Sequence, residues 1–189
     1  DYLRQATGDT VMYSPYRFRA EDIRYEGRLL EATTVIGVSA NMAEIREVNL
    51  TDSRFFTEQE ERSKVQVAVI GDEVRQFYFP ATSPLGRIIK IAGFDFTING
   101  VQEKIGNAGG QSQDNSAFIP ATVFNRIYGP ERSMLLFARA RPESGLSLEE
   151  ALDLTRIALR NRFKARPGMP DNFDTITPDT IREFIGRIM

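Results

Sequence analysis

The middle of the chain alternates apolar and polar residues with the period of a β-strand. Val65–Ile70 places a valine at every second position and ends at a glycine. Ile89–Ile91 and Phe94–Ile98 alternate in the same way on either side of Ala92-Gly93, which predicts a hairpin with a two-residue loop. These runs are rich in β-branched and aromatic residues, which favour strands. The centre of the chain is therefore predicted to be built mainly of strands.

The flanking parts of the chain show helical spacing and helix-start signals. Ser147 and Glu150 form a capping box that opens the clearest helix, and its apolar positions predict a buried stripe of Leu148, Leu152, Thr155, Leu159 and Phe163. Thr57 and Glu60 form a second capping box before a short turn. Further helices are predicted around Leu3 up to Gly8, from Ser39 or Asn41 through Met42, Ile45 and Val48, from Asp72 to Pro80, and from Thr177-Pro178-Asp179 onward.

Short strands are also expected in these flanks. Thr10–Tyr13 is predicted to stop before Pro15, and Val35–Val38 is a buried strand by its β-branched content. Met134–Ala138 and Phe173–Ile176 are the last predicted strands. Strands in the centre with longer helices toward both ends indicate an α+β fold.

The composition narrows the range of functions that the protein can have. The 189 residues contain 24 Lys and Arg against 26 Asp and Glu, and the net charge of −2 argues against a nucleic-acid binder. There is no Cys and no His, which removes disulfides, thiolate chemistry, the commonest metal ligand and the usual general base. No Ser-x-x-Lys and no Gly-x-x-x-x-Gly-Lys occurs. We therefore predict no catalytic residue, no cofactor and no metal site.

The chain also lacks segments that mark a membrane span or a signal peptide. Its longest apolar run is strand-sized, whereas a transmembrane helix needs about 20 mostly apolar residues. The first residues are polar, and the final helical pattern is still running at Met189. We interpret the sequence as a piece of a longer protein.

Two polar segments are candidate interaction surfaces. Ile105–Ser116 is rich in Gly, Asn and Gln and predicts a long flexible loop, either a partner-binding loop or simply a mobile hairpin tip. Its candidate partner residues are Gly106, Gly109, Gly110, Gln111 and Asp114. The end of the helix after Ser147 carries a basic group, which is either a solvated helix end or a contact for an anionic membrane or partner: Arg156, Arg160, Arg162, Lys164 and Arg166.

Several short phrases, in a fixed order, carry a family resemblance. They are Val35-Ile36-Gly37-Val38-Ser39, Ser53-Arg54-Phe55-Phe56-Thr57, Val67-Ala68-Val69-Ile70-Gly71, Phe77 to Ile91 with Pro84-Leu85-Gly86, Phe96 to Gly100-Val101, Ile119-Pro120 and Asn172-Phe173 to Thr177. Together they make the chain resemble the periplasmic core domain of MacB-type ABC-transporter permeases, a group that includes the lipoprotein-release permeases and is related to FtsX. The signature positions are Gly37, Val38, Arg54, Phe55, Phe56, Gly71, Pro84, Gly86, Gly100 and Pro120.

The sequence departs from the family pattern at two places. Ser53 stands where the family has a glycine before Arg-Phe. The segment between Tyr13 and Ile36 is short, and Arg19–Ile23 is the one candidate remnant of a helix that the family carries there. Either the element has been lost or residues are absent from the sequence.

The resemblance implies two subdomains and a place in a transporter. A porter-like βαβ subdomain would come from residues 1–60 and 119–189, and a β-rich sabre-like subdomain from residues 61–118. The domain would stand on the periplasmic or extracellular side of a bacterial membrane, between two helices of its permease. It would couple ATP hydrolysis by a separate domain or subunit to export, extraction or signalling.

The resemblance also implies partners and a mechanical role. The permease would act as a dimer, and the domain would meet a periplasmic adaptor, a carrier or the cargo. The final helix would form a stalk with the first one through Ile181, Phe184, Ile185 and Ile188. The alternative is a free-standing periplasmic binding or adaptor protein, and an enzyme is the least favoured class.

Overall fold

The computed structural model describes residues 2–108, 111–130 and 134–180. Its helices are α1 (Tyr2–Ala6), α2 (Met42–Ile45), α3 (Glu58–Arg62), α4 (Asp72–Tyr78), α5 (Ala121–Tyr128) and α6 (Leu148–Arg162), with a 3₁₀ turn at Pro142–Ser144. Its strands are β1 (Val11–Tyr25), β2 (Arg28–Val38), β3 (Leu50–Ser53), β4 (Val67–Ile70), β5 (Ile88–Ile91), β6 (Phe94–Gln102), β7 (Asn107–Ala108), β8 (Gln111–Ser112), β9 (Ser116–Pro120) and β10 (Leu135–Ala140).

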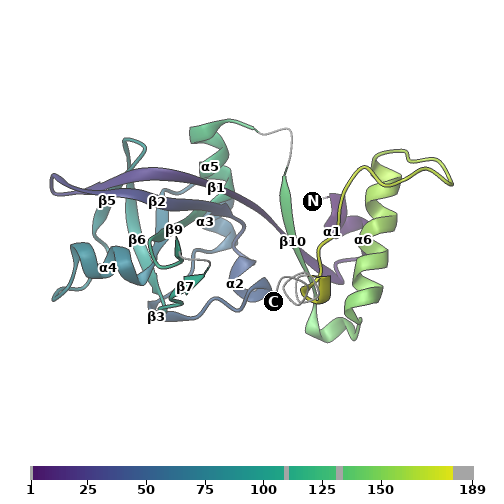
Figure 1. The fold of residues 1–189 in the computed structure, drawn as a ribbon, viewed down its shortest axis with the longest axis horizontal. Helices are drawn as coiled ribbons and strands as arrows, with labels where there is room; N and C mark the ends of the chain where they lie inside the picture. Colours follow the sequence, from purple (N-terminus) through teal and green to yellow (C-terminus); the bar gives the residue numbers. More distant parts are fainter. Residues whose placement is uncertain (1, 109–110, 131–133, 181–189) are drawn as a thin grey trace.

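A closed ring of strand pairs forms the larger part of the molecule. β1, β2, β9, β4, β6 and β5 pair in this order, and β5 pairs back with β1, so the ring closes into a barrel. β3 extends the sheet beside β6, and β10 extends it beside the first half of β1. Figure 1 shows the barrel at the left and α1 and α6 at the right, with β1 reaching from one part to the other.

Two apolar cores lie on opposite faces of β2, β9 and β4. One core fills the barrel and is covered by α4 and α5; it contains Ile23, Val35, Ile70, Ile89, Ile91, Phe96, Ile98, Ile119 and Phe124. The other lies under α2 and the Phe55-Phe56 pair and contains Met12, Ile36, Val38, Met42, Ile45, Val67, Val69 and Phe118. Since side chains alternate across a strand, neighbouring residues such as Val35 and Ile36 enter different cores.

Most local predictions are confirmed. Both capping boxes are present, with Thr57 capping α3 and Ser147 capping α6. β5 and β6 form the predicted hairpin, and Ala92 and Gly93 have the positive φ angles, 51° and 83°, that its tight turn requires. The mixed α+β fold class is confirmed as well.

The prediction that the first strand stops before Pro15 is wrong. β1 continues to Tyr25 and pairs with β2 from Tyr16 onward. Pro15 comes one residue before that pairing begins, so its missing N–H does not interrupt the ladder with β2. Arg19–Ile23 lies inside β1 as well, and so it is not a helical remnant.

Two predictions near the C-terminal end are also wrong. Phe173–Ile176 forms no strand, and the ring of Phe173 lies 6.5 Å from that of Phe163 instead. The buried face of α6 is made by Ala151, Thr155 and Ala158, whereas Leu148 and Phe163 of the predicted stripe are exposed. A helix begins at Pro178, as predicted, and the N–H of Thr180 donates to the Thr177 hydroxyl at 3.2 Å.

The division into residues 1–60 plus 119–189 and residues 61–118 stays a prediction. The barrel takes β1 and β2 from the first of these parts and β4, β5 and β6 from the second, so one sheet crosses the proposed boundary. Ile181, Phe184, Ile185 and Ile188, the predicted stalk, lie outside the described residues.

Candidate functional site

The junction between the barrel and the helices α1 and α6 is the candidate functional site. It is built on β1, a strand of 15 residues. Val11 to Tyr16 pair with β10, and Tyr16 to Tyr25 pair with β2. At Tyr16 the strand is paired on both sides, so the hydrogen-bond ladder passes without a break from one part to the other.

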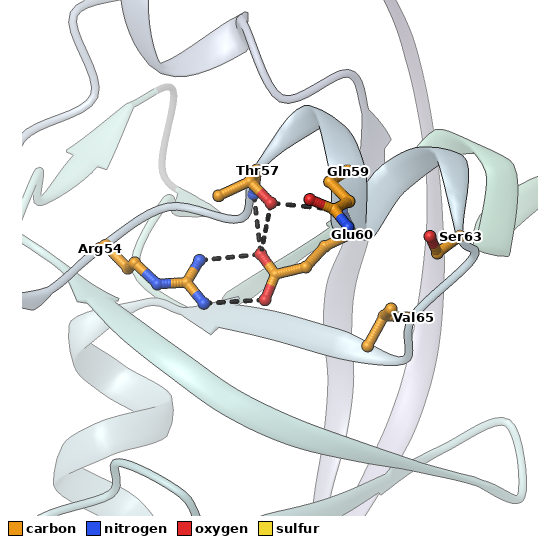
Figure 2. A pocket seen from close by; sticks show the side chains of 6 residues that line it. All are labelled: Arg54, Thr57, Gln59, Glu60, Ser63 and Val65. Carbon is orange, nitrogen blue, oxygen red and sulfur yellow. Dashed lines mark hydrogen bonds and ion pairs between the residues drawn. The ribbon is translucent and has the colours of Figure 1, made fainter.

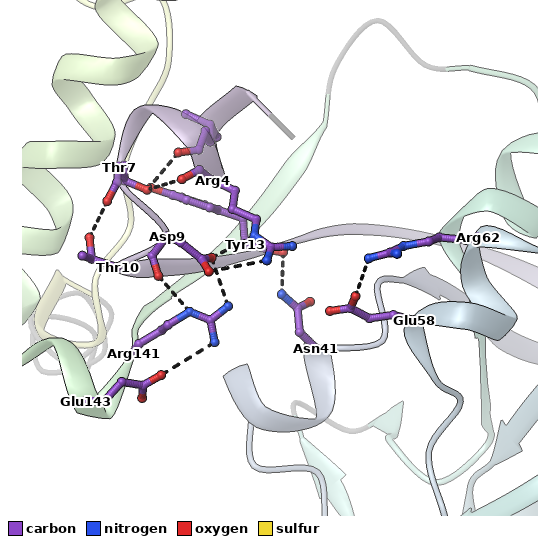
Figure 3. A network of polar contacts seen from close by, with 11 residues as sticks. Arg4, Thr7, Asp9, Thr10, Tyr13, Asn41, Glu58, Arg62, Arg141 and Glu143 are labelled. Carbon is purple, nitrogen blue, oxygen red and sulfur yellow. Dashed lines mark hydrogen bonds and ion pairs between the residues drawn. The ribbon is translucent and has the colours of Figure 1, made fainter.

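Asp9 joins the turn after α1 to β10. Gly8 and Asp9 both have left-handed backbone conformations, with φ of 60° and 58°, which reverse the chain between α1 and β1. The Asp9 carboxylate accepts from Arg4 Nε at 2.8 Å and from Arg141 Nη2 at 3.1 Å, and Arg141 Nε donates to the Asp9 carbonyl at 2.8 Å. Figure 3 shows Asp9 between the two guanidinium groups.

The electrostatics of this cluster favour the charged carboxylate. The hydrogen bond from Arg4, followed by the one from Arg141, lowers the pKa of Asp9 below its ordinary value. About half of the Asp9 side chain is exposed, so solvent screens the pairs and their main effect is to fix the geometry of the turn.

Two tyrosines dock α6 onto the rest of the junction. The Thr155 hydroxyl donates to the Ala151 carbonyl at 2.7 Å, so in its 2.7 Å contact with Tyr13 it is the acceptor and the tyrosine donates. The Tyr2 hydroxyl donates to the Ala158 carbonyl at 3.1 Å. One bond therefore ties α6 to β1 and the other ties it to α1.

A second polar cluster holds the Arg-Phe-Phe-Thr phrase. Arg54 makes a bidentate ion pair with Glu60, with both N···O distances 2.8 Å, and the Glu60 carboxylate also accepts the Thr57 N–H at 2.8 Å. The Arg54 bond is the main reason that the pKa of Glu60 falls to about 2. Figure 2 shows this pair beside an open hollow of about 230 Å³ that Gln59, Ser63 and Val65 also line.

The contacts beside this hollow are structural. The donors of Arg54 are used by Glu60 and by the Phe55 carbonyl, at 3.0 Å, so its guanidinium is committed to the fold. The pair fixes the turn that presents Phe55 and Phe56 to the second core, where both are buried and their ring centroids are 4.4 Å apart.

Three signature glycines are places where another chain segment comes too close for a side chain. A Cβ at Gly37 would lie 2.5 Å from Cβ of Phe124, one at Gly71 would lie 2.1 Å from the Asp114 carbonyl oxygen, and one at Gly100 would lie 2.5 Å from the Arg54 carbonyl oxygen. Of the other signature positions, Val38, Pro84 and Pro120 are buried, and Gly86 is exposed with a φ of 74°. The signature positions therefore lie in packing contacts and turns.

The candidate partner loop has an anchored base. Asp114 is 5% exposed, and its carboxylate accepts the N–H of Ile105 at 2.7 Å and that of Gly106 at 2.9 Å. β7 and β8 pair above this contact. Gly109 and Gly110 lie outside the described residues, as does the side chain of Gln111. Asp114 therefore has a structural contact, and the role of the loop stays a prediction.

Residues 2–108, 111–130 and 134–180 contain neither a cluster of metal-ligating side chains nor a membrane-spanning helix. They bring together no group of three or more His, Cys, Asp or Glu side chains that could hold a metal ion. None of their helices has both the length and the apolar character needed to cross a bilayer.

Sequence reasoning missed Asp9, Arg141, Tyr13 and Thr155 as a group. The partners in each contact are separated by more than a hundred residues along the chain, as the pairs Asp9–Arg141 and Tyr13–Thr155 show. The local signal was Gly8, which correctly predicted the end of α1 but gave no partner for the Asp9 carboxylate.

Comparisons with known proteins place this fold in a family. The model of the MacB-like periplasmic core domain matches residues 2–155. The macrolide export ATP-binding/permease protein MacB of Shewanella sp. is 30% identical over 164 residues, which are 86% of this chain and 24% of that protein. The pyoverdine export ATP-binding/permease protein PvdT of Pseudomonas aeruginosa is 30% identical over 140 residues, which are 72% of this chain and 21% of that protein. The chain thus spans about a quarter or less of these relatives.

Solved structures with low sequence identity share the fold. The periplasmic region of MacB from Actinobacillus actinomycetemcomitans superposes with a TM-score of 0.74 at 15% identity, covering 92% of this chain and 75% of that one. The extracellular domain of the ABC-type transporter YknZ from Gram-positive bacteria gives a TM-score of 0.67 at 17% identity, covering 87% and 83%. Since the family model matches most of the sequence and the fold agrees with it, the chain belongs to the family of MacB-like periplasmic core domains.

Proposed function

We propose that this chain is the extracytoplasmic domain of an ABC-transporter permease and that it transmits force. ATP hydrolysis by a cytoplasmic domain or subunit would move the membrane helices, and this domain would convert that movement into export, extraction or signalling outside the membrane. The curated relatives are named as export ATP-binding/permease proteins, which supports the assignment to a transporter. The domain itself performs no chemical step in this proposal.

The observation that carries the proposal is the continuity of β1 across the junction. α1 leads through the turn at Asp9 directly into β1, which is one of the strands of the barrel. α6 contacts α1 and is hydrogen-bonded to β1 through Tyr13. A displacement that enters at α1 therefore reaches the barrel along paired backbone, without a flexible linker in between.

The finer parts of the function rest on the same arrangement. We propose that α1 and the helix beginning at Pro178 continue into membrane helices of the permease, with Ile181, Phe184, Ile185 and Ile188 as their contact. The permease would act as a dimer, and an adaptor, carrier or cargo would meet the domain at the loop around Gly106 to Asp114. The porter-like and sabre-like parts would be portions of one body, because the barrel takes strands from both of them.

The test uses the parent permease with its ATP-binding partner in proteoliposomes. Asp9→Asn keeps a residue that tolerates the left-handed backbone but loses the charge that binds Arg4 and Arg141. We expect ATP hydrolysis to persist while transport per ATP falls. Lys90→Gln is the matched control, because it removes an exposed ion pair, with Asp95, in a hairpin of the barrel. Equal transport in all three proteins would refute force transmission through the junction.

The location is tested with a single introduced cysteine. The sequence contains no Cys, so Lys104→Cys adds a unique exposed thiol to this part of the protein. A membrane-impermeant maleimide should label it in intact cells of the host. Labelling only after lysis would contradict an extracytoplasmic position, and labelled protein that is released without detergent would favour the free-standing binding or adaptor protein.

A further inference from the structure

Positive charge is concentrated toward the end of α6 and in the turn that follows it. Between Asp153 and Asp171 the sequence contains no acidic residue and five basic ones, although the whole chain carries a net charge of −2. Figure 1 shows this turn at the far end of the long axis, on the opposite side of α6 from the barrel. The basic residues therefore lie in the second half of α6 and in the protruding turn after it, and their charge is opposite to that of the remainder.

Two of the five basic residues build this turn. Arg156 Nε donates to the Asp171 carboxylate at 2.5 Å, and Arg160 binds the other oxygen of the same carboxylate. Arg160 also donates to the carbonyls of Met169 and Arg166, both at 3.0 Å. These bonds fold the segment after α6 back onto the helix, and the two arginines are consequently satisfied within the fold.

The other three basic residues face outward. Arg162, Lys164 and Arg166 are exposed, and none of them makes an ion pair with any residue that the structure describes. The guanidinium of Arg162 lies over the Tyr2 ring, 5.4 Å from its centroid, a contact that leaves its charge uncompensated. Arginine and lysine side chains of this kind bind phosphate oxygens through charge-assisted hydrogen bonds.

Large apolar side chains of the same stretch of sequence are exposed as well. Ile157 is 58% exposed, Phe163 is 52% exposed and Met169 is 54% exposed. A bilayer interface accepts both kinds of side chain, with cations at the headgroups and apolar side chains just below them. A protein partner would instead bury these residues in a complementary groove of its own.

We propose that this tip, made of Arg162, Phe163, Lys164, Arg166 and Met169, docks on a membrane surface that contains anionic phospholipid headgroups. The cations bind the phosphates, and the apolar side chains enter the boundary between headgroups and acyl chains. The negative charge of the remaining domain is repelled by the same surface, so the domain is oriented with its tip toward the lipid. The proposal goes beyond force transmission and does not require transport.

The test is vesicle flotation with the 189-residue chain. Vesicles of phosphatidylglycerol mixed with phosphatidylcholine should bind the protein, vesicles of phosphatidylcholine alone should not, and added salt should weaken the binding. Each basic residue near an anionic surface contributes about a fivefold increase in affinity. The double variant Lys164→Gln with Arg166→Gln should therefore bind about 25-fold more weakly.

A matched control separates the tip from net charge. Lys64 follows α3 as Lys164 follows α6, it is exposed, and the φ angles of the two lysines are 55° and 52°. The variant Lys64→Gln with Lys104→Gln removes the same charge from the barrel side and should bind like the wild type. Phe163→Ser with Met169→Ser should lower affinity while leaving the salt dependence unchanged, because it removes no charge.

Three outcomes would overturn the proposal. The wild-type chain could fail to bind anionic vesicles, or the control pair could reduce binding as much as the tip pair. Soluble polyglutamate, at the same concentration of negative charge as the vesicles, could also displace the protein from them. That result would indicate an acidic protein as the partner. Circular dichroism of each variant confirms that a loss of binding is not a loss of folding.

Discussion

The hydrogen bond between Tyr13 and Thr155 offers a quantitative test of the junction. Tyr13→Phe removes the donor, and Thr155→Val removes the acceptor with little change of shape. Thr155 is buried and Tyr13 is half-buried, so each single variant should lose about 1 kcal/mol of unfolding free energy, the ordinary net value of such a bond. For a chain of 189 residues this corresponds to a melting temperature lower by about 2–4 °C.

The double variant isolates the bond itself. If the two side chains act only through each other, the double variant should be about 1 kcal/mol more stable than the sum of the single losses predicts. The sequence contains no Trp, so urea unfolding is best followed by the helical circular dichroism signal. In the double variant, the backbone amide hydrogens of α6 should also exchange with solvent faster than those of the barrel, because the helix undocks as a unit.

The control is Tyr25→Phe. Tyr25 is half-buried like Tyr13, but its hydroxyl makes no hydrogen bond within the described part of the chain, so its removal should change stability by less than about 0.5 kcal/mol. A coupling energy within about 0.3 kcal/mol of zero would refute the docking of α6 through Thr155. Unchanged exchange in α6 of the double variant would refute it independently.

Further predictions concern packing, pH and the loop base. Gly37→Ala should cost about 3 kcal/mol, because its Cβ would meet Phe124 at 2.5 Å; Gly27→Ala, in open space with a φ of 79°, should cost only about 1 kcal/mol, and equal melting temperatures would contradict this. Since the pKa of Glu60 is lowered to about 2, its contribution is complete above its unfolded pKa near 4.5 and lost as pH falls toward 2. The stability difference between wild type and Glu60→Gln should therefore shrink over that window in acid titrations followed by circular dichroism, and a constant difference would count against it. Asp114→Asn leaves one of two backbone N–H groups without its acceptor and should cost about 2 kcal/mol, with faster amide exchange at the loop base; an unchanged exchange rate would show that the base is held otherwise.

Local sequence signals predicted the elements that local interactions determine. The capping boxes at Thr57 and Ser147 depend on residues three positions apart, and the hairpin at Ala92-Gly93 depends on its own turn. The family phrases also indicated the class of protein correctly, and three of their glycines lie at close approaches in this fold, as Gly71 does beside Asp114.

Tertiary contacts decided the features that the sequence did not predict. The large apolar residues of α6 suggested its buried face, but the helix packs through Ala151 and Ala158, whose small side chains permit close approach. Arg19–Ile23 has helix-compatible residues, yet pairing with β2 holds it extended. Phe173–Ile176 has strand propensity without a ladder to join, because Asp171 directs the segment along α6.

The closure of the barrel has a kinetic consequence. β1 meets β2 from Tyr16 to Tyr25, across a short turn, but it meets β5 at Ile23 and Arg24, opposite Ile91 and Lys90. The first pairing is local, while the second joins distant parts of the chain and must await the formation of β4, β5 and β6. This short seam therefore forms after the β1–β2 hairpin during folding, and closing it converts the open sheet into a barrel.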